Sequence, residues 1–394
     1  MEPRTRALLT AALVLGVAAG PLTAPVTAHP RSPAAAGAAS PGAGTGTGAG
    51  GTRTAGPDAD ALRSAMAGLP DRDVTAALVR VGGRGAWHGA AGVRDVTTGA
   101  PALEHGRFRA GSVTKVVTAA LVLQLAAEGR VDLDAPVAAY LPELSSPAFT
   151  RPVTVRHLLR FTSGLRAGVS LGDTVEEGYP HRFETLTPRE VVASAVAGGP
   201  AFAPGTRQEY NNVNYIALGM LVEKVTGDSY GRQAALRVLR PLGMRHTSFP
   251  GGSDPRVHGP HNRGYDWIDG RLVDVTEWNV SDRWAAGDMI STTADLERLL
   301  VALFRGRLVP GPLSQEFFTV PEVTGATRAA GGMQRYEVNG REVWGKTGSR
   351  PGYHTVIAAT PDLSRTVVYS VNSTDAKGDA WGVVERFAFP AFNR

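Results

Sequence analysis

The pattern of apolar and polar positions predicts strands at both ends of the folded part of the chain. Near its start, a helix over residues 58–69 precedes an apolar strand over 74–81 and a second strand around 86–93. Toward the C-terminus, Asn339 and Gly340 have the composition of a two-residue hairpin turn between two strand-like runs. In full, the C-terminal region is predicted to contain strands over 333–338, 341–348, 354–360 and 366–372 and a closing helix over 378–389.

Helical periodicity dominates the middle of the chain. The clearest helix start combines Thr187 as N-cap, Pro188 in the first helical position and Glu190 as the partner that closes a capping box. Residues 213–227 form a second predicted helix, whose final glycine is suited to a left-handed C-terminal conformation. Residues 292–306 form a third.

This order of elements predicts an α/β fold class with two lobes. Strands at both ends of the chain imply that the termini share one α/β lobe, into which a mainly helical lobe, roughly residues 150–285, is inserted. The folded region over residues 58–394 is also large for a single core. We therefore expect a cleft between the two lobes.

The N-terminal region has a different composition from the rest. Residues 1–28 combine Arg4 and Arg6 with a short apolar run and a small-x-small cleavage site, which is typical of a secretory signal peptide. Residues 29–57 consist almost only of small residues and proline and are predicted to be a disordered linker. The stretch GTGAGG over 46–51 matches G-x-G-x-x-G, but no strand precedes it and no helix follows, so we interpret it as low complexity.

Composition and charge exclude several classes of partner. The chain has a net charge of +5, its arginines are dispersed, and no basic run alternates with aromatic residues, so nucleic acid is not expected as a partner. There is no cysteine, which excludes disulfides and lipid-modified cysteine. Beyond the signal peptide no apolar run reaches the roughly 20 residues of a transmembrane helix. We expect a secreted monomer outside the membrane, with the cell wall as a candidate location, and no cofactor.

Lysine is rare in this chain, and one lysine follows a serine at helical spacing. Of the 41 arginines and lysines only four are lysines, so a position that needs only positive charge would almost always have arginine. Lys115 lies three residues after Ser112 at the start of a helix that is apolar on nearly every side, so amine and hydroxyl would be neighbours. A desolvated lysine whose pKa falls below about 10.4 can accept the serine proton, whereas arginine cannot.

Two further polar clusters follow along the chain. Tyr210 and Asn212 are two apart in a segment predicted to be extended, which would send both side chains the same way. Lys346 opens the stretch KTGS on a strand after the predicted hairpin. There Thr347 supplies a hydroxyl and Gly348 allows another group to approach the backbone closely.

In this order, SVTK, YNN and KTG resemble the three signatures of the penicillin-recognising serine hydrolases, S-x-x-K, Y-x-N and K-T-G. With tyrosine in its second motif, the chain resembles the branch that contains class C β-lactamases, secreted serine D-alanyl-D-alanine carboxypeptidases and related esterases and peptidases. The likeness covers nearly all of residues 58–394 and includes framework stretches such as TVRHLLRFTSGL. It implies a β-lactamase/transpeptidase-like fold, with an antiparallel sheet flanked by helices and an active site in the cleft beside the helical lobe.

The resemblance also implies roles for the motif residues. Ser112 would form an acyl-enzyme, Lys115 would take or relay its proton, and Tyr210 would be the partner acid or base, with its phenolate favoured by nearby ammonium groups. The backbone N–H groups of Ser112 and Ser349 would form the oxyanion hole. The implied substrate-binding residues are Asn212, Lys346, Thr347, Gly348 and Ser349.

One more binding residue is predicted from the register of the hairpin. An ideal two-residue turn pairs Val338 with Arg341 and therefore Arg335 with Trp344. This register places Arg335 on the face of Lys346. We expect Arg335 to help anchor the terminal carboxylate of a substrate.

The function expected from the sequence is a D-alanyl-D-alanine carboxypeptidase-like peptidase that acts on cell-wall peptides and also binds penicillin. A class C-like β-lactamase, an esterase of the same superfamily and a non-catalytic wall-peptide binder remain alternatives, because the motifs do not reveal the leaving group. A Ser-His-Asp hydrolase is disfavoured, since the chain has no G-x-S-x-G. His258 and His261 lie in a Gly/Pro loop and are interpreted as surface residues, so no metal is expected. Ser370 and Asn372 make a literal S-x-N inside an apolar strand and are interpreted as structural.

Overall fold

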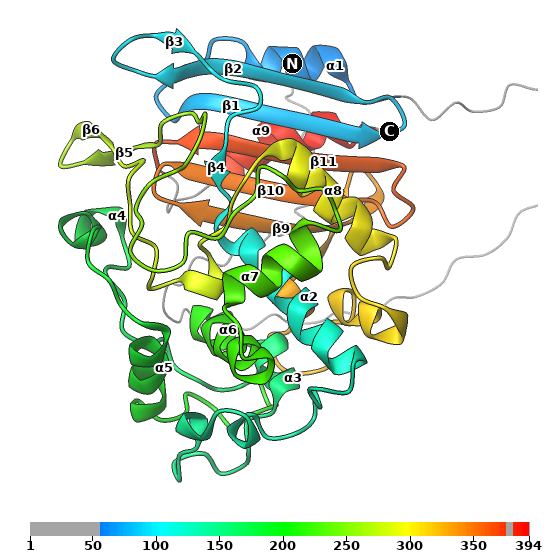
Figure 1. The fold of residues 1–394 in the computed structure, drawn as a ribbon. Coiled ribbons are helices and arrows are strands. Elements are labelled where there is room, and N and C mark those ends of the chain that lie inside the picture. The colour runs from blue at the N-terminus through cyan, green and yellow to red at the C-terminus, as the bar shows by residue number, and fades with distance from the viewer. Residues whose placement is uncertain (1–55, 376–380, 394) are drawn as a thin grey trace, which may run out of the picture.

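Seven antiparallel strands form the central sheet of the protein (Figure 1). The computed structural model describes residues 56–375 and 381–393. Strand β1 pairs with β11, for example Val81 with Val367, so the two ends of the chain share one lobe as the sequence predicts. In spatial order the strands are β3 (Ala100–Pro101), β2 (Trp87–Asp95), β1 (Val74–Gly83), β11 (Arg365–Ser373), β10 (Tyr353–Ala359), β9 (Arg341–Arg350) and β8 (Gln334–Val338).

Helices cover both faces of this sheet. On one face α1 (Ala59–Met66) and α9 (Trp381–Ala391) pack together and bury Leu62 and Phe387 against the strands. On the other face α8 (Thr293–Phe304) crosses β1, β10 and β11. Strands buried on both faces have continuous apolar sequence, which explains why β10 and β11 lack a polar alternation.

The helical lobe lies below the sheet in Figure 1 and packs around α2. Helix α5 begins with the predicted capping box of Thr187 and Glu190, and α6 ends at Gly227 in the left-handed conformation with φ 70°. The helices of this lobe are α2 (Thr114–Ala127), α3 (Val155–Leu159), α4 (Val175–Gly178), α5 (Pro188–Ala197), α6 (Asn212–Thr226) and α7 (Tyr230–Ala234).

Two small sheets complete the fold. Strand β4 (Phe108–Arg109) pairs with β7 (Ile290–Ser291) immediately before the segment that carries Ser112. The hairpin of β5 (Tyr265–Ile268) and β6 (Arg271–Asp274) projects beside the main sheet. Residues 1–28, expected to be a signal peptide, and nearly all of the expected linker lie outside the described residues. In the part of the chain that is described, no helix combines the length and apolarity needed to cross a membrane.

Candidate active site

Ser112 lies in a 3₁₀ turn that touches the backbone of β9. A side chain at Gly111, where φ is 52°, would place its Cβ 2.6 Å from the backbone nitrogen of Ser349. A Cβ at Gly348 would lie 2.1 Å from the carbonyl oxygen of Ala110 and 2.8 Å from the backbone nitrogen of Ser112. Only glycine permits such an approach of two backbones. The two glycines therefore bring together the N–H-bearing segments that the sequence predicts as the oxyanion hole.

The part of β9 that faces Ser112 is an edge. Strand β8 pairs with β9 only as far as Gln334 with Gly345. Beyond that point, β9 pairs with β10 on one side, and the turn with Ser112 lies against it. Thr347 and Ser349 are half-buried along this stretch, while Lys346 is 5% exposed.

Lys115 is completely buried, and its Nζ touches three oxygen atoms. It lies 3.1 Å from Ser112 Oγ, 2.7 Å from Asn212 Oδ1 and 2.7 Å from the carbonyl oxygen of Ala286. The amide and carbonyl oxygens can only accept hydrogen bonds, whereas the serine hydroxyl can also donate one. A neutral amine that donates to the two acceptors keeps its lone pair for the Ser112 hydroxyl.

The surroundings of Lys115 favour this neutral amine. Burial lowers the pKa of Lys115 well below its usual value, and the charges of Lys346, Arg350 and Arg283 lower it further. Arg350 is itself buried and donates from Nε to the carbonyl oxygen of Gly287 at 3.0 Å. The site thus lowers the pKa of the base that the sequence predicts.

Tyr210 differs from the expectation in its ionisation. Its ring stacks on Phe161, with the centroids 4.8 Å apart, and its buried hydroxyl has no well-formed hydrogen bond to any described residue. Burial raises the pKa of Tyr210 to about 12, although the neighbouring Ser112 hydroxyl and the charges of Arg328 and Arg350 act in the opposite direction. Nearby cations thus favour the phenolate, as predicted, but burial outweighs them in the unliganded site. Tyr210 is a neutral phenol at pH 7.

Asn212 is helical rather than extended. Asn211 is the N-cap of α6 and Asn212 is the first residue of the helix, so the predicted extended spacing from Tyr210 fails. Asn211 stays extended and accepts from the backbone nitrogen of Val213, and this bond starts the helix. The half-buried Asn212 nevertheless reaches the site through its bond from Lys115.

Three basic side chains surround the ring of Tyr210. The Nζ atoms of Lys115 and Lys346 lie 4.9 and 5.2 Å from its centroid, and the guanidinium carbon of Arg328 lies 5.1 Å away. Burial lowers the pKa of Lys346 to about 7, and the charge of Arg328 contributes to the shift. Lys346 Nζ donates to the carbonyl oxygen of Thr347 at 2.6 Å.

Arg328 is a residue of the site that the sequence motifs do not predict. It stands apart from every motif, so no spacing marks it. The nearest signal is the glycine pair that follows it: a Cβ at Gly332 would lie 2.9 Å from Lys346 Cε and 3.5 Å from Tyr210 Cε2. A glycine pair before a strand can mark a close approach to another part of the chain.

A family model described as Beta-lactamase matches residues 62–383. The chain belongs to the Beta-lactamase family. Membership confirms the resemblance to penicillin-recognising serine hydrolases, and the antiparallel sheet flanked by helices confirms the predicted fold class.

Similar proteins within this superfamily differ in what they act on. A crystal structure of a D-stereospecific amidohydrolase from a Streptomyces species is 30% identical, with a TM-score of 0.71, and the alignment covers 84% of this chain and 98% of that one. Esterase EstB from Burkholderia gladioli is 34% identical over 195 residues, 44% of this chain and 46% of EstB. Protein flp from Staphylococcus aureus strain MRSA252 is 30% identical over 211 residues, 52% of this chain. The chain spans less than half the length of these two curated relatives, 40% in the case of Protein flp.

Arg335 has the predicted strand register, but its side chain lies beside Glu342 and not beside the other residues of the site. It pairs with Trp344, and Val338 pairs with Arg341, as the hairpin predicts. Its side chain is 66% exposed and its guanidinium lies 3.6 Å from Glu342. Its role as a carboxylate anchor stays a prediction.

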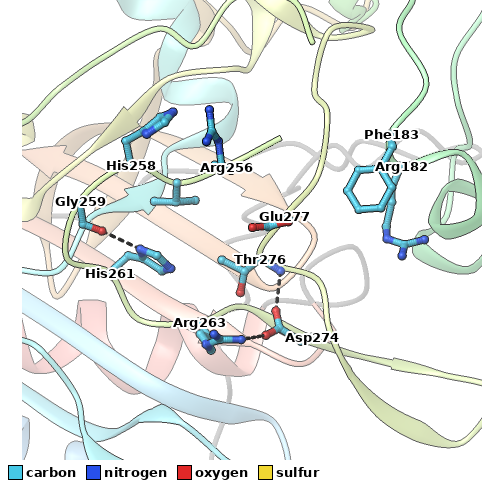
Figure 2. Close-up of a pocket in the computed structure, with 11 residues that line it drawn as sticks. Arg182, Phe183, Arg256, His258, Gly259, His261, Arg263, Asp274, Thr276 and Glu277 are labelled. Atoms are coloured by element: carbon cyan, nitrogen blue, oxygen red, sulfur yellow. Dashed lines mark hydrogen bonds and ion pairs between the residues drawn. The ribbon is translucent and has the colours of Figure 1, made fainter. Parts of the chain in front are cut away.

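The remaining sequence candidates lie outside the site. Ser370 and Asn372 are buried in β11, where Asn372 Nδ2 donates to the carbonyl oxygen of Arg263 at 2.9 Å, which confirms their structural interpretation. His258 and His261 line a separate cavity of about 540 Å³ (Figure 2). The lining of this cavity contains none of the predicted catalytic or binding residues.

Two arginines of this cavity are ion-paired. Arg256 pairs with Asp254, and Figure 2 shows Arg263 with Asp274. His261 Nδ1 lies 2.7 Å from the carbonyl oxygen of Gly259. In residues 56–375 and 381–393, no group of three or more histidine, aspartate or glutamate side chains is arranged to hold a metal ion.

Proposed function

We propose that the protein is a serine amidohydrolase that cleaves amide bonds next to D-amino acid residues through an acyl-enzyme at Ser112, with D-alanyl-D-alanine carboxypeptidase-like action on cell-wall peptides. The observation that carries the proposal is the position of Lys115 Nζ, 3.1 Å from Ser112 Oγ, with its other two contacts on acceptor oxygens. Action on wall peptides also implies that the protein works outside the cytoplasm, as the N-terminal sequence leads us to expect.

In the acylation step, Ser112 Oγ attacks the substrate carbonyl carbon while its proton passes to the neutral amine of Lys115. The carbonyl oxygen gains negative charge, which the backbone N–H groups of Ser112 and Ser349 would stabilise. The proximity of the two segments, enforced by Gly111 and Gly348, supports this assignment.

The leaving amine then needs a proton, and Tyr210 is suited to supply it. Its phenol is protonated at pH 7 and lies beside the serine, which is the state a general acid requires. The resulting phenolate would recover its proton from the ammonium of Lys115, whose Nζ lies 4.9 Å from the Tyr210 ring centroid. Water would deacylate the enzyme by the reverse sequence. An amine leaving group depends on this acid more than the less basic alkoxide of an ester does, so the protonated phenol supports amide cleavage.

The cations at the other side of Tyr210 support a substrate with a carboxylate. Lys346 is buried, and Arg328 makes no ion pair with an acidic side chain of the described chain. A terminal carboxylate placed between them would form charge-assisted hydrogen bonds. This is the arrangement that a carboxypeptidase needs, whereas an aminoacyl amide has no such group.

The D-stereospecific amidohydrolase from Streptomyces supports the choice of bond, since its alignment covers 84% of this chain. EstB, 34% identical over 195 residues, supports ester hydrolysis as a second candidate. Amide cleavage and ester hydrolysis differ in the leaving group, whereas both proceed through an acyl-enzyme.

Four assays on one preparation separate these functions. D-alanine release from diacetyl-L-lysyl-D-alanyl-D-alanine, together with a penicilloyl adduct that persists for many minutes, would support the proposal. Hydrolysis of D-alaninamide without cleavage of diacetyl-L-lysyl-D-alanyl-D-alanine would restrict the activity to an amidase. Rapid penicillin turnover alone would indicate a β-lactamase, and short-chain ester hydrolysis alone would indicate an esterase. Ser112→Ala is the control in each assay and should abolish both turnover and covalent labelling.

A further inference from the structure

Gln208 is a buried residue whose side-chain amide is fully used. It is 6% exposed and lies two residues before Tyr210. Its Nε2 donates to the carbonyl oxygens of Arg160 at 2.9 Å and Arg328 at 2.7 Å. Its Oε1 accepts from the backbone nitrogens of Thr327 at 2.8 Å and Arg328 at 3.0 Å. A glutamine side chain has two donor hydrogens and two acceptor lone pairs, so all four are occupied.

Three of these four bonds go to the backbone of residues 327 and 328. The segment has no regular strand or helix there, and the amide of Gln208 takes the place of a neighbouring strand. The backbone of Gln208 adds a further link, since its nitrogen donates to the carbonyl oxygen of Thr324 at 2.9 Å. Gln208 therefore ties the loop before β8 to the segment that carries Tyr210.

The guanidinium of Arg328 has little else to fix its position. Its Nη1 donates to Thr327 Oγ1 at 3.2 Å, and its carbon lies 5.1 Å from the centroid of the Tyr210 ring. No carboxylate among the described residues pairs with it. Arg328 also forms an isolated bridge with Gln334, which holds the other side of the segment. The direction of its side chain thus depends on where this backbone is held.

We propose that Gln208 is a positioning residue that holds Arg328 over the face of Tyr210 and thereby gives the site its preference for a ligand with a carboxylate over the neutral amide of the same ligand. This inference rests on the proposed function in its choice of ligand, a D-residue with a free carboxylate. Gln208 itself touches the backbone of the loop and not the reacting atoms.

Arg328 and Lys346 act together in this arrangement. Both lie about the ring of Tyr210, and the charge of Arg328 disfavours the charged form of Lys346 in the empty site. An anion that binds between them relieves this repulsion, so its affinity depends on the distance between the two cations. A shift of the 327–328 backbone would weaken anion binding while leaving Ser112 and Lys115 in place.

The test measures binding instead of turnover. Dissociation constants of N-acetyl-D-alanine and of N-acetyl-D-alaninamide are obtained by NMR titration of the whole protein at pH 6.5, and their ratio gives the preference for the anion. We expect the parent protein to bind the acid about tenfold or more tightly than the amide, as charge-assisted hydrogen bonds imply. Gln208→Met should remove most of this ratio and leave the affinity for the amide within about threefold.

A double-mutant cycle separates positioning from general loosening of the fold. Arg328→Met should remove most of the preference and leave the part that is due to Lys346, and adding Gln208→Met to Arg328→Met should then change it no further. Gln233→Met is the matched control, because Gln233 is also buried and hydrogen-bonded, to Asp228 and Arg237, but lies in α7. This control should lower stability and leave the preference unchanged.

Several outcomes would overturn the inference. They are equal affinity of the parent for acid and amide, an equal loss for both ligands in Gln208→Met, or additive effects of Gln208→Met and Arg328→Met. If Gln208→Met does not fold, Gln208→Glu serves in the same cycle, since it keeps the shape and loses the donors to Arg160 and Arg328. Failure of the proposed function is measured separately. It would appear as the absence of D-alanine release, whereas the role of Gln208 is judged only from the ratio of the two dissociation constants.

Discussion

Lys115 and Asn212 are joined by a hydrogen bond in which Nζ donates to Oδ1 over 2.7 Å. The amide oxygen orients the amine without the full negative charge that would raise its pKa. A carboxylate in the same place would give the same geometry and the opposite electrostatic effect. The uncharged side chain at this position is therefore part of how the base stays neutral.

Asn212→Asp should reduce kcat/KM at pH 7 by about tenfold or more. The new carboxylate beside Nζ favours the ammonium form and raises the pKa of Lys115. Because the neutral amine is the active form, activity should recover as the pH rises, and the acid limb of the kcat/KM profile should move to higher pH. The profile measured from pH 5 to 10 checks this.

Asn211→Asp is the matched control for that substitution. It adds the same charge one residue away, where the side chain caps α6 and does not bond Lys115. Its acid limb should move much less. Equal shifts in the two variants, or no shift in Asn212→Asp, would contradict the assignment of Lys115 as the base.

Lys115→Arg should be nearly as inactive as Lys115→Ala. Arginine keeps a positive charge beside Ser112 but cannot release its proton in a protein, so no base remains. The measurement is the second-order rate of Ser112 acylation by a fluorescent penicillin. An arginine variant that acylates at close to the parental rate would show that charge alone is needed here.

Tyr210→Phe should lose activity without losing stability. The hydroxyl is buried and makes no well-formed hydrogen bond to a described residue, so its removal should lower the free energy of unfolding by less than about 1 kcal/mol. Loss of a general acid reduces kcat by about 10²- to 10⁴-fold. Denaturant unfolding and kcat on the same sample separate the two effects. A strongly destabilised variant would mean that the hydroxyl has a structural partner.

KM for a substrate with a free carboxylate should rise above pH 7. The pKa of Lys346 is about 7, so the cation that attracts the carboxylate is present below that pH and is lost above it. KM should then increase by up to about tenfold per pH unit, while KM for the amidated substrate stays level.

Arg328→Ala and Arg335→Ala divide the roles of the two nearby arginines. Removing Arg328 should raise KM for the free carboxylate at every pH and also raise the pKa of Lys346, which moves the upward bend of KM to higher pH. Arg335 is mostly exposed near Glu342, so its loss should not move that bend. A larger increase in KM for Arg335→Ala, limited to peptides with a free C-terminus, would instead identify Arg335 as the main anchor.

Local patterns were sufficient to predict most elements and the motif residues. The capping box at Thr187, the left-handed end of α6 at Gly227 and the turn at Asn339 all appear where the sequence places them, because each depends on residues adjacent in the chain. The pairing of the first strand with the last followed from the order of elements. These features require no knowledge of distant neighbours.

The features that the sequence did not predict depend on tertiary structure. Burial outweighs nearby positive charge at Tyr210, and the depth of a side chain cannot be read from spacing. Asn211, rather than Asn212, takes the extended position because it caps the helix. Arg328 is held at the site by hydrogen bonds from the side-chain amide of Gln208 to its backbone, and the two residues are 120 positions apart in the chain. No local sequence pattern predicts such a contact.

The pairing of β1 with β11 restricts the order in which the molecule can form. Val74 lies opposite Ser373, so a ribosome must make the chain as far as β11 before the centre of the sheet can close. Until then the apolar edge of β1, paired only with β2, stays open to other strands. While this edge is unpaired, the growing chain is exposed to wrong strand pairing and aggregation. Truncation before residue 365 would therefore remove the central strand of the sheet instead of trimming its end.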